Sequence, residues 1–248
     1  MAYKRNDNVP SEGQELAQRI LNPQGHPHSY PTLIMVLKIH GAATPCTQRV
    51  LSVLYEKAVP FELIRVDLAT AEHKCGKHLE NHPFGLCPFI DDDGFILYES
   101  RAIAQYIAMK YQDQGTQGLI PNDLKSYARF QQAASTETSY FNDLAGTVLM
   151  ERIFKPMFLN IEGDQKLIED SLSKLAANLD VYETILSKQK YLGGDEVTLA
   201  DLYHLPCGTL LPAAGSDVIE SRPNVARWFK ELSSRKSWQA TLAATSKL

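Results

Sequence analysis

The residues with the clearest chemical potential in this sequence lie between Pro83 and Ser100. Pro83, Gly85 and Pro88 fall within six positions, a spacing that predicts a fixed loop and not a helix. Beyond this loop, Glu99 and Ser100 precede apolar residues at helical spacing, so a helix is expected to begin there. Because a helix N-terminus carries unpaired N–H donors and about half a positive charge, this position is suited to bind a carboxylate.

Pro88 stands directly before a predicted strand, a place where proline can adopt a cis peptide bond. With that bond the backbone N–H and C=O of Cys87 are expected to point outward. They can then pair with an extended peptide as an added strand would. Together with the helix start, this loop predicts a small acidic peptide as the ligand.

The composition is that of a soluble globular protein. Of 248 residues, 44% are hydrophobic and 22% are charged, and the formal net charge is −4, which excludes a general attraction to nucleic acid or acidic membranes. No apolar run is long enough to span a bilayer, and the first residues lack the apolar core of a signal peptide. The four cysteines make no disulfide framework, so reduced thiols and a cytoplasmic location are expected.

Residues 1–34 are rich in polar and turn-forming residues, and they predict a largely irregular extension with one short helix at Gln14–Leu21. Two roles are open for it, a dispensable tail or a segment folded over the active site or the dimer interface. From residue 36 a βαβ unit follows, with strands at 36–39 and 61–67 and a helix at 46–57. A parallel strand pair with a crossover helix indicates a buried sheet with helices on its faces.

Short apolar runs at Phe89–Ile90 and Phe95–Tyr98 flank an acidic turn that ends in Gly94, the pattern of a strand hairpin. With the helix from residue 99, the order becomes βαβ and then ββα. This predicts an α/β thioredoxin-like domain at 35–112. A polar, breaker-rich linker at 113–122 then leads to an all-α domain at 123–248. In that domain helices are expected at 123–153, 164–189, 199–213 and 223–234, with Thr198 and Asp201 spaced as an N-capping box.

Four short segments of this sequence resemble the glutathione-binding region of cytosolic glutathione transferases. They are most similar to the phi class of plants and its fungal relatives. The segments are Glu72-His73-Lys74, Pro83-Phe84-Gly85, Cys87-Pro88 and Glu99-Ser100-Arg101-Ala102-Ile103. With the motifs of the helical part, the resemblance covers about residues 36–240. It implies a homodimeric enzyme that joins glutathione to a hydrophobic electrophile, or that uses glutathione to assist an isomerisation or elimination in a biosynthetic pathway.

The resemblance also assigns the contacts along the glutathione peptide. It implies that the γ-glutamyl end lies at Glu99 and Ser100, the cysteinyl portion at the backbone of Cys87 before Pro88, and the glycine carboxylate at His73 and Lys74. Glutathione is thus the expected co-substrate. No metal is expected, because the histidines and Cys75 of this segment have irregular spacing and no second ligand pair nearby.

Glutathione transfer is thiolate chemistry, and a free thiol has a pKa near about 8.5. In the related enzymes a hydroxyl at a helix start stabilises the thiolate. Here the resemblance places Thr44 at that position, with Thr47 as the second candidate. Thr44 followed by Pro45 also has the residue types of a helix N-cap with proline at the first helical position, and the two roles are compatible.

Two departures from the family pattern leave other functions open. The turn before Thr44 is one residue shorter than usual, and Leu86 stands where the family has a glutamine, although leucine cannot form a hydrogen bond with glutathione. Cys46 is expected to be buried filler, but it also permits an alternative, a Cys46-dependent thiol transferase or deglutathionylase. A further alternative is a non-catalytic protein that binds hydrophobic ligands.

The hydrophobic substrate is expected between the two domains, where aromatic and apolar side chains can line a pocket. The candidate residues for this pocket are Ala43, Tyr140, Phe141 and Phe154.

Overall fold

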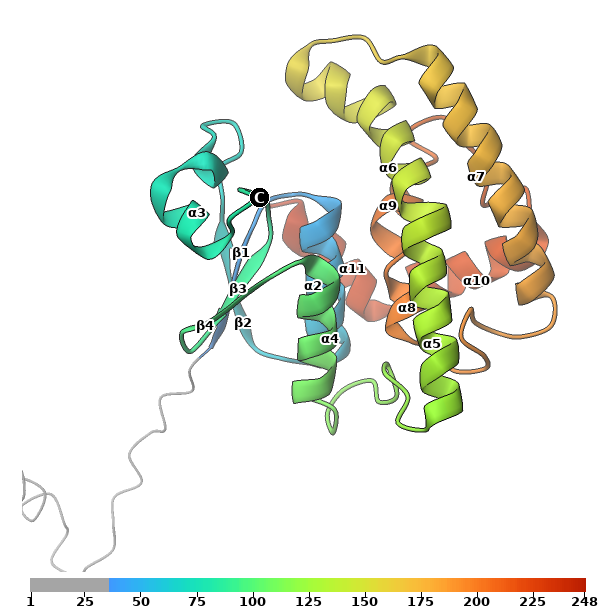
Figure 1. The fold of residues 1–248 in the computed structure, drawn as a ribbon, viewed down its shortest axis with the longest axis horizontal. Helices are drawn as coiled ribbons and strands as arrows, with labels where there is room; N and C mark the ends of the chain where they lie inside the picture. Colours follow the sequence, from blue (N-terminus) through green and yellow to red (C-terminus); the bar gives the residue numbers. More distant parts are fainter. Residues whose placement is uncertain (1–35) are drawn as a thin grey trace, which may run out of the picture. The chain divides into compact units, whose positions relative to one another are not determined.

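Four strands between Leu37 and Tyr98 form one mixed sheet (Figure 1). The structure is a computed structural model that describes residues 36–248, so the predicted extension 1–34 and its helix lie outside the described residues. The sheet order is β2-β1-β3-β4, with β1 and β2 parallel and both other pairs antiparallel. The strands are β1 (Leu37–Gly41), β2 (Phe61–Arg65), β3 (Phe89–Asp92) and β4 (Phe95–Tyr98). The predicted thioredoxin-like order, βαβ then ββα, is confirmed.

Helices cover both faces of this sheet. Helices α2 (Pro45–Glu56) and α4 (Ser100–Lys110) pack together on the side that faces the helical part of the chain, and the short α3 (Gly76–Asn81) lies on the other side (Figure 1). Neither α3 nor the 3-10 turn η1 (Glu72–Lys74) before it was expected from the sequence. The only buried residue of α3 is His78, so no apolar period marks the helix.

The hairpin between β3 and β4 has the predicted tight turn. Asp93 and Gly94 both have positive φ, 56° and 85°, and the carboxylate of Asp91 accepts a hydrogen bond from the Gly94 N–H at 2.7 Å. The turn therefore uses the left-handed conformation that glycine tolerates without cost.

The helical part begins with one continuous helical path from Leu124 to Leu159. The sequence predicted a helix at 123–153, but the path runs further and includes two π-helical segments, η2 and η3. Pro156 lies within η3, where a proline cannot donate the regular backbone hydrogen bond, and π turns accommodate such an interruption. The segments are α5 (Leu124–Thr136), η2 (Glu137–Asn142), α6 (Asp143–Leu149) and η3 (Met150–Leu159).

The remaining helices follow the prediction in order but not in every boundary. The predicted helix 199–213 is divided in two, because Pro206 has no N–H to donate to Leu202. The last helix was not expected, since its buried face carries Ser237, Thr241 and Thr245 beside Trp238 and so lacks an apolar period. The helices are α7 (Gln165–Leu186), α8 (Leu199–Leu202), α9 (Leu205–Leu210), α10 (Pro223–Ser233) and α11 (Lys236–Thr245). Residues 36–248 form one unit, and the division into domains at 112 and 123 stays a prediction.

The capping box at the start of α8 is confirmed. The buried carboxylate of Asp201 accepts hydrogen bonds from both the backbone N–H and the hydroxyl of Thr198, each at 2.9 Å. The same carboxylate accepts a hydrogen bond from the indole N–H of Trp228 at 3.0 Å. Asp201 therefore closes the N-terminus of α8 and fixes α10 against it.

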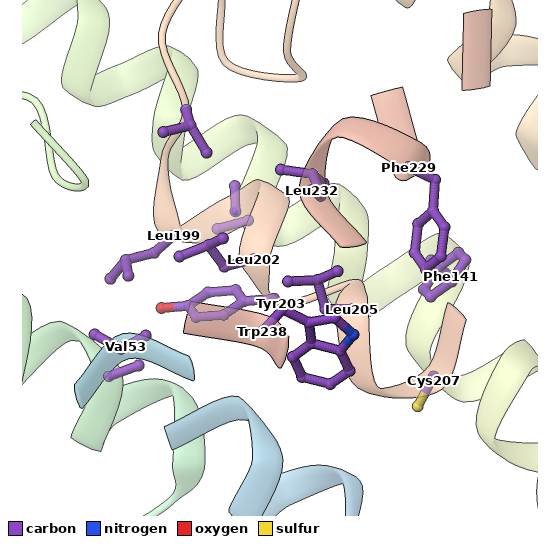
Figure 2. Packing of buried hydrophobic residues seen from close by; sticks show 14 of the residues in the cluster. Val53, Phe141, Leu199, Leu202, Tyr203, Leu205, Cys207, Phe229, Leu232 and Trp238 are labelled. Atoms are coloured by element: carbon purple, nitrogen blue, oxygen red, sulfur yellow. The ribbon is translucent and has the colours of Figure 1, made fainter. Parts of the chain in front are cut away.

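Helix α2 is shared by the two parts of the fold. Its residues Val50, Leu51, Val53 and Leu54 are fully buried, and α2 contacts α4 on one side and α8, α9 and α11 on the other. Figure 2 shows Val53 facing the cluster around Leu199 and Tyr203, which continues to Trp238. One apolar core thus runs from the sheet layer into the helical layer.

His204 is a buried histidine within this helical core. Its Nδ1–H donates to the carbonyl of Ala200 at 2.8 Å, and the hydroxyl of Tyr182 donates to Nε2 at 3.1 Å. The ring also packs against Phe141 and Trp228. Burial disfavours the charged form and lowers the pKa of His204 to about 3.

We predict that His204 makes the protein less stable as the pH falls from about 6.5 toward 3, the interval between its unfolded and folded pKa values. In that interval the unfolded chain binds the extra proton, so this residue alone lowers the free energy of unfolding by up to about 1.4 kcal/mol per pH unit. Urea unfolding of the wild type and His204→Phe between pH 7 and about pH 4 checks this. The gap between the two free energies should narrow as the pH falls, and parallel curves would contradict the prediction.

Candidate active site

The N-terminus of α2 is built as predicted around Thr44. Thr44 is the N-cap residue, Pro45 is the first helical residue, and the Thr44 hydroxyl accepts a hydrogen bond from the Thr47 N–H at 3.3 Å. Thr44 is half-buried, so its hydroxyl lies at the boundary between protein and solvent. This is the position at which an anion meets the positive end of the helix dipole.

Thr47 does not fit the predicted role of a second thiolate-stabilising group. It is fully buried, and its hydroxyl lies 3.1 Å from the Thr44 hydroxyl. A group with no access to solvent cannot touch a bound thiol at the surface. The correction follows from the helical spacing, because residue N3 points back toward the cap and not out of it. Thr47 therefore orients Thr44.

Cys46 is exposed, and the expectation that it is buried filler was wrong. It is the second residue of α2. The guanidinium Nη1 of Arg49 lies 3.7 Å from its sulfur. A thiol at a helix N-terminus beside a cation is in the kind of place where reactive cysteines occur.

The Cys87–Pro88 peptide bond is cis, as predicted. The Cys87 thiol is half-buried, and burial raises its pKa to about 11, so at neutral pH it is a protonated thiol and not a nucleophile. Within residues 36–248 the backbone N–H of Cys87 makes no hydrogen bond. Cys87 thus offers a free backbone donor and an unreactive side chain.

At the start of α4, Glu99 is exposed and holds a backbone conformation of φ 72° and ψ 106°. For a residue other than glycine this costs about 1–3 kcal/mol, and such strain gathers at functional sites. The next residue, Ser100, is buried, and its hydroxyl accepts a hydrogen bond from Nη1 of Arg49 at 2.9 Å. With its oxygen held in this way, the Ser100 hydroxyl proton is free to be donated to a ligand.

Arg49 is a site residue that was not predicted from the sequence. It is fully buried in α2, and besides Ser100 it reaches Asn142 in η2, where Nη2 donates to the side-chain carbonyl at 3.1 Å. The carboxylate of Glu137 lies 3.9 Å from the same nitrogen and is held by two hydrogen bonds from Arg101, at 2.8 and 2.9 Å. The signal was present, because an arginine inside an otherwise apolar helix face must find a buried partner.

His73 and Lys74 lie in η1, beside the loop that leads to Pro88. The ammonium of the exposed Lys74 donates to the carbonyl of Phe84 at 3.3 Å. Burial lowers the pKa of His73, so this ring is neutral at neutral pH. The loop lies close to η1, since a β-carbon on Gly85 would come within 2.8 Å of the His73 carbonyl.

The four predicted pocket residues have different surroundings. Ala43 is exposed next to Thr44, and Phe154 is half-buried in η3 with its ring 6.2 Å from that of Phe158. Tyr140 instead lines a separate cavity of about 280 Å³ against α7, and Phe141 is a core residue with 1% exposure that packs on His204. The prediction was wrong for Phe141, which takes a core position, and Tyr140 faces α7.

Within residues 36–248 no three His, Cys, Asp or Glu side chains are placed to hold a metal ion. In the same range no helix has the length and apolar character that crossing a membrane requires.

Comparison with known proteins decides the family. Residues 35–109 match the model of the glutathione S-transferase N-terminal domain, and residues 141–236 match the model of the C-terminal domain. The chain belongs to the glutathione S-transferase family. Glutathione S-transferase F12 of Arabidopsis thaliana is 43% identical over 83% of this chain and 96% of the relative. Glutathione S-transferase hmp2 of Hypomyces subiculosus is also 43% identical, over 82% of this chain and 96% of the relative.

Solved structures of glutathione transferases agree with this family assignment. Glutathione transferase F7 from Populus trichocarpa is 37% identical, with a TM-score of 0.81 over 85% of this chain and 99% of that chain. Glutathione S-transferase I from maize, solved with an atrazine glutathione conjugate, is 32% identical, with a TM-score of 0.78 over 85% of this chain and 98% of that chain. The predicted resemblance to phi-class enzymes of plants and fungi is confirmed. The chain is a glutathione transferase of this type, and glutathione is its co-substrate.

We predict that Arg49→Met lowers the free energy of unfolding by about 3–5 kcal/mol, because it leaves the buried Glu137 with fewer partners and removes the bonds to Ser100 and Asn142. Chemical denaturation measures the loss. The control is Arg129→Met on the exposed surface of α5, which should stay within about 0.5 kcal/mol of the wild type. A loss at Arg49 no larger than the control would show that this network does not hold the site together.

Proposed function

We propose that this enzyme binds glutathione with its sulfur at the Thr44 hydroxyl and stabilises the thiolate for attack on a hydrophobic electrophile, or for a glutathione-assisted isomerisation or elimination. One observation carries the proposal. The Thr44 hydroxyl lies half-exposed at the N-cap of α2, 3.1 Å from the buried hydroxyl of Thr47. If Thr47 donates its proton to the Thr44 oxygen, the single proton of Thr44 is left to point outward at the sulfur.

The chemistry is a balanced two-electron step. The thiol proton of glutathione leaves to solvent, since the helix N-terminus and the Thr44 proton lower the pKa of the thiol below about 8.5. The thiolate electron pair then forms the new carbon–sulfur bond, and the leaving group departs with the electrons of the bond that breaks. In an isomerisation the same thiolate adds and is later expelled, so glutathione is regenerated.

The contacts with the rest of glutathione follow the residues described above. The Cys87 N–H is available for the cysteinyl carbonyl, and Ser100 at the start of α4 offers a hydroxyl proton to the γ-glutamyl carboxylate. His73 and Lys74 lie beside the loop for the glycine carboxylate, with Lys74 as a flexible point charge. Glu99 is the acceptor for the γ-glutamyl ammonium group.

The maize relative binds an atrazine glutathione conjugate, which supports an aromatic electrophile as the first test substrate here. Ala43 beside Thr44 and Phe154 in η3 remain the proposed contacts for that substrate, because both carry apolar side chains that reach the surface.

We also propose that the enzyme is a cytoplasmic homodimer. Large apolar side chains are exposed on α4 and α5, among them Met109 at 64% and Leu124 at 82%, and exposed apolar groups of this size favour association. Light scattering on the purified protein is expected to give twice the 27.7 kDa mass of one chain. A monomer at micromolar concentration would contradict it.

A second function has one observation in its favour. Cys46 is exposed at the same helix start and has Arg49 beside its sulfur, as a Cys46-dependent thiol transferase requires. In that reaction the Cys46 thiolate attacks a mixed disulfide, releases one thiol and is itself left bound to glutathione, which a second glutathione then removes as the disulfide.

We predict that Thr44→Val lowers kcat/KM for conjugation of an aromatic electrophile by about 100-fold, and that it raises the pKa of bound glutathione toward about 8.5. Thr44→Ser keeps the hydroxyl and should stay within a few-fold of the wild type. Ultraviolet absorbance of the thiolate against pH gives the pKa, and steady-state kinetics give kcat/KM.

Two controls separate the alternatives. Asp123→Ala removes the N-cap of α5, whose carboxylate accepts from the Ser126 N–H at 3.0 Å, so it should lower stability by about 1 kcal/mol and leave conjugation unchanged. Cys46→Ser should retain conjugation. If Cys46→Ser abolishes disulfide reduction while Thr44→Val leaves conjugation intact, a Cys46-dependent thiol transferase replaces the function proposed for Thr44. Ligand binding with no turnover in the wild type would indicate a carrier protein.

A further inference from the structure

The loop between Pro83 and Pro88 is held from the α3 side by His78. This histidine is 8% exposed, and its Nε2 lies 2.8 Å from the backbone carbonyl of Leu86. A carbonyl oxygen can only accept a hydrogen bond, so Nε2 must carry the proton and donate it. The bond joins α3 to the residue directly before Cys87.

This hydrogen bond fixes the direction of the Cys87 N–H. The Leu86–Cys87 peptide is trans, since the only cis bond within residues 36–248 is the next one. In a trans peptide the C=O and the following N–H lie in one plane and point in opposite directions. When His78 holds the Leu86 carbonyl toward α3, the Cys87 N–H must point away from α3. That N–H makes no hydrogen bond within the described part of the chain.

The imidazole of His78 is itself held by aromatic neighbours. Phe89 meets it edge to face with ring centres 5.1 Å apart, and the ring of His82 lies nearly parallel at 6.3 Å. His40 stacks on Phe89 at 4.3 Å. The rings of His40, His78 and Phe89 line a cavity of about 300 Å³ on the α3 side of the sheet, and from there His78 reaches the loop.

The other contacts with this loop involve Phe84 and Gly85. Lys74 donates to the carbonyl of Phe84 at 3.3 Å in an exposed position, and Gly85 packs on the backbone of His73. Neither contact touches the Leu86–Cys87 peptide. Among the side chains that the structure describes, His78 alone forms a hydrogen bond with this peptide.

We propose that His78 is a positioning residue for glutathione, which orients the Cys87 N–H toward the cysteinyl carbonyl of the bound tripeptide. The inference rests on the proposed function for the identity of the ligand. His78 acts through the peptide and does not touch the sulfur, so it governs the affinity for glutathione and not the reactivity of the thiolate.

The test uses two replacements that separate the shape of His78 from its proton. His78→Phe keeps an aromatic ring and loses the donor, whereas His78→Gln loses the ring and keeps an amide N–H near the position of Nε2. The matched control is His40→Phe, which changes a histidine of the same cavity that makes no hydrogen bond with the loop. All are made in the full chain.

Steady-state kinetics with an aromatic electrophile, and calorimetry with glutathione alone, give the readout. In His78→Phe we expect KM and Kd for glutathione to rise about 5- to 10-fold, the value of one lost hydrogen bond, while kcat and KM for the electrophile stay unchanged. His78→Gln should recover most of the affinity, and His40→Phe should resemble the wild type. A fall in kcat with unchanged glutathione affinity, or equal losses in the Phe and Gln variants, overturns the proposal.

Amide hydrogen exchange of Gly85, whose N–H donates to the carbonyl of His82 at 2.8 Å, gives an answer in the ligand-free protein that does not depend on glutathione. Exchange there should be faster in His78→Phe than in the wild type and should be restored in His78→Gln. Unchanged exchange in His78→Phe overturns the positioning role even if the proposed function holds. If the wild type itself binds no glutathione, the proposed function fails, and the exchange experiment still decides whether His78 holds the loop.

Discussion

The buried guanidinium of Arg49 connects the helix N-termini that carry the proposed chemistry. From inside α2 it donates to Ser100 at the start of α4, and it reaches Asn142 and Glu137 in the helical part. Apolar packing holds layers together without direction, whereas charge-assisted hydrogen bonds have a fixed geometry. Burying a charge is costly unless all its hydrogen-bond partners are in place, so one geometry of this network is strongly favoured. That geometry sets the distance between the N-termini of α2 and α4.

The candidate site then depends on small groups held from behind. The buried Thr47 directs the Thr44 hydroxyl, Arg49 occupies the oxygen of Ser100, and His78 turns the Cys87 peptide. In each pair the inner group has no access to the ligand and the outer group keeps a donor free. The residues that touch glutathione in the proposed function are therefore oriented before it arrives, which reduces the ordering cost of binding.

The order of strands and main helices could be predicted because its signals are local or periodic, as in the Gly94 turn and the Thr198 capping box. Helix α3 could not be found, since its buried side is one histidine. The burial of individual residues was even harder to predict from the sequence. Tyr140 and Phe141 lie in a π-helical segment, whose wider turn shifts side chains from the positions that a 3.6-residue period assigns. Ser100 and Asn142, which accept hydrogen bonds from Arg49, lie 51 and 93 positions away from it, and no local sequence pattern contains them.

Helix α2 packs against both the sheet layer and the helical layer, and its first turn bears the proposed thiolate site. Glutathione bound there contacts the element that both layers need in order to fold. By mass action, a ligand at 100 times its Kd adds about 2.7 kcal/mol to the stability of the native state. The melting temperature of the whole unit thus becomes a reporter of occupancy at one helix end. Candidate conjugates can therefore be ranked by thermal shift without a turnover assay.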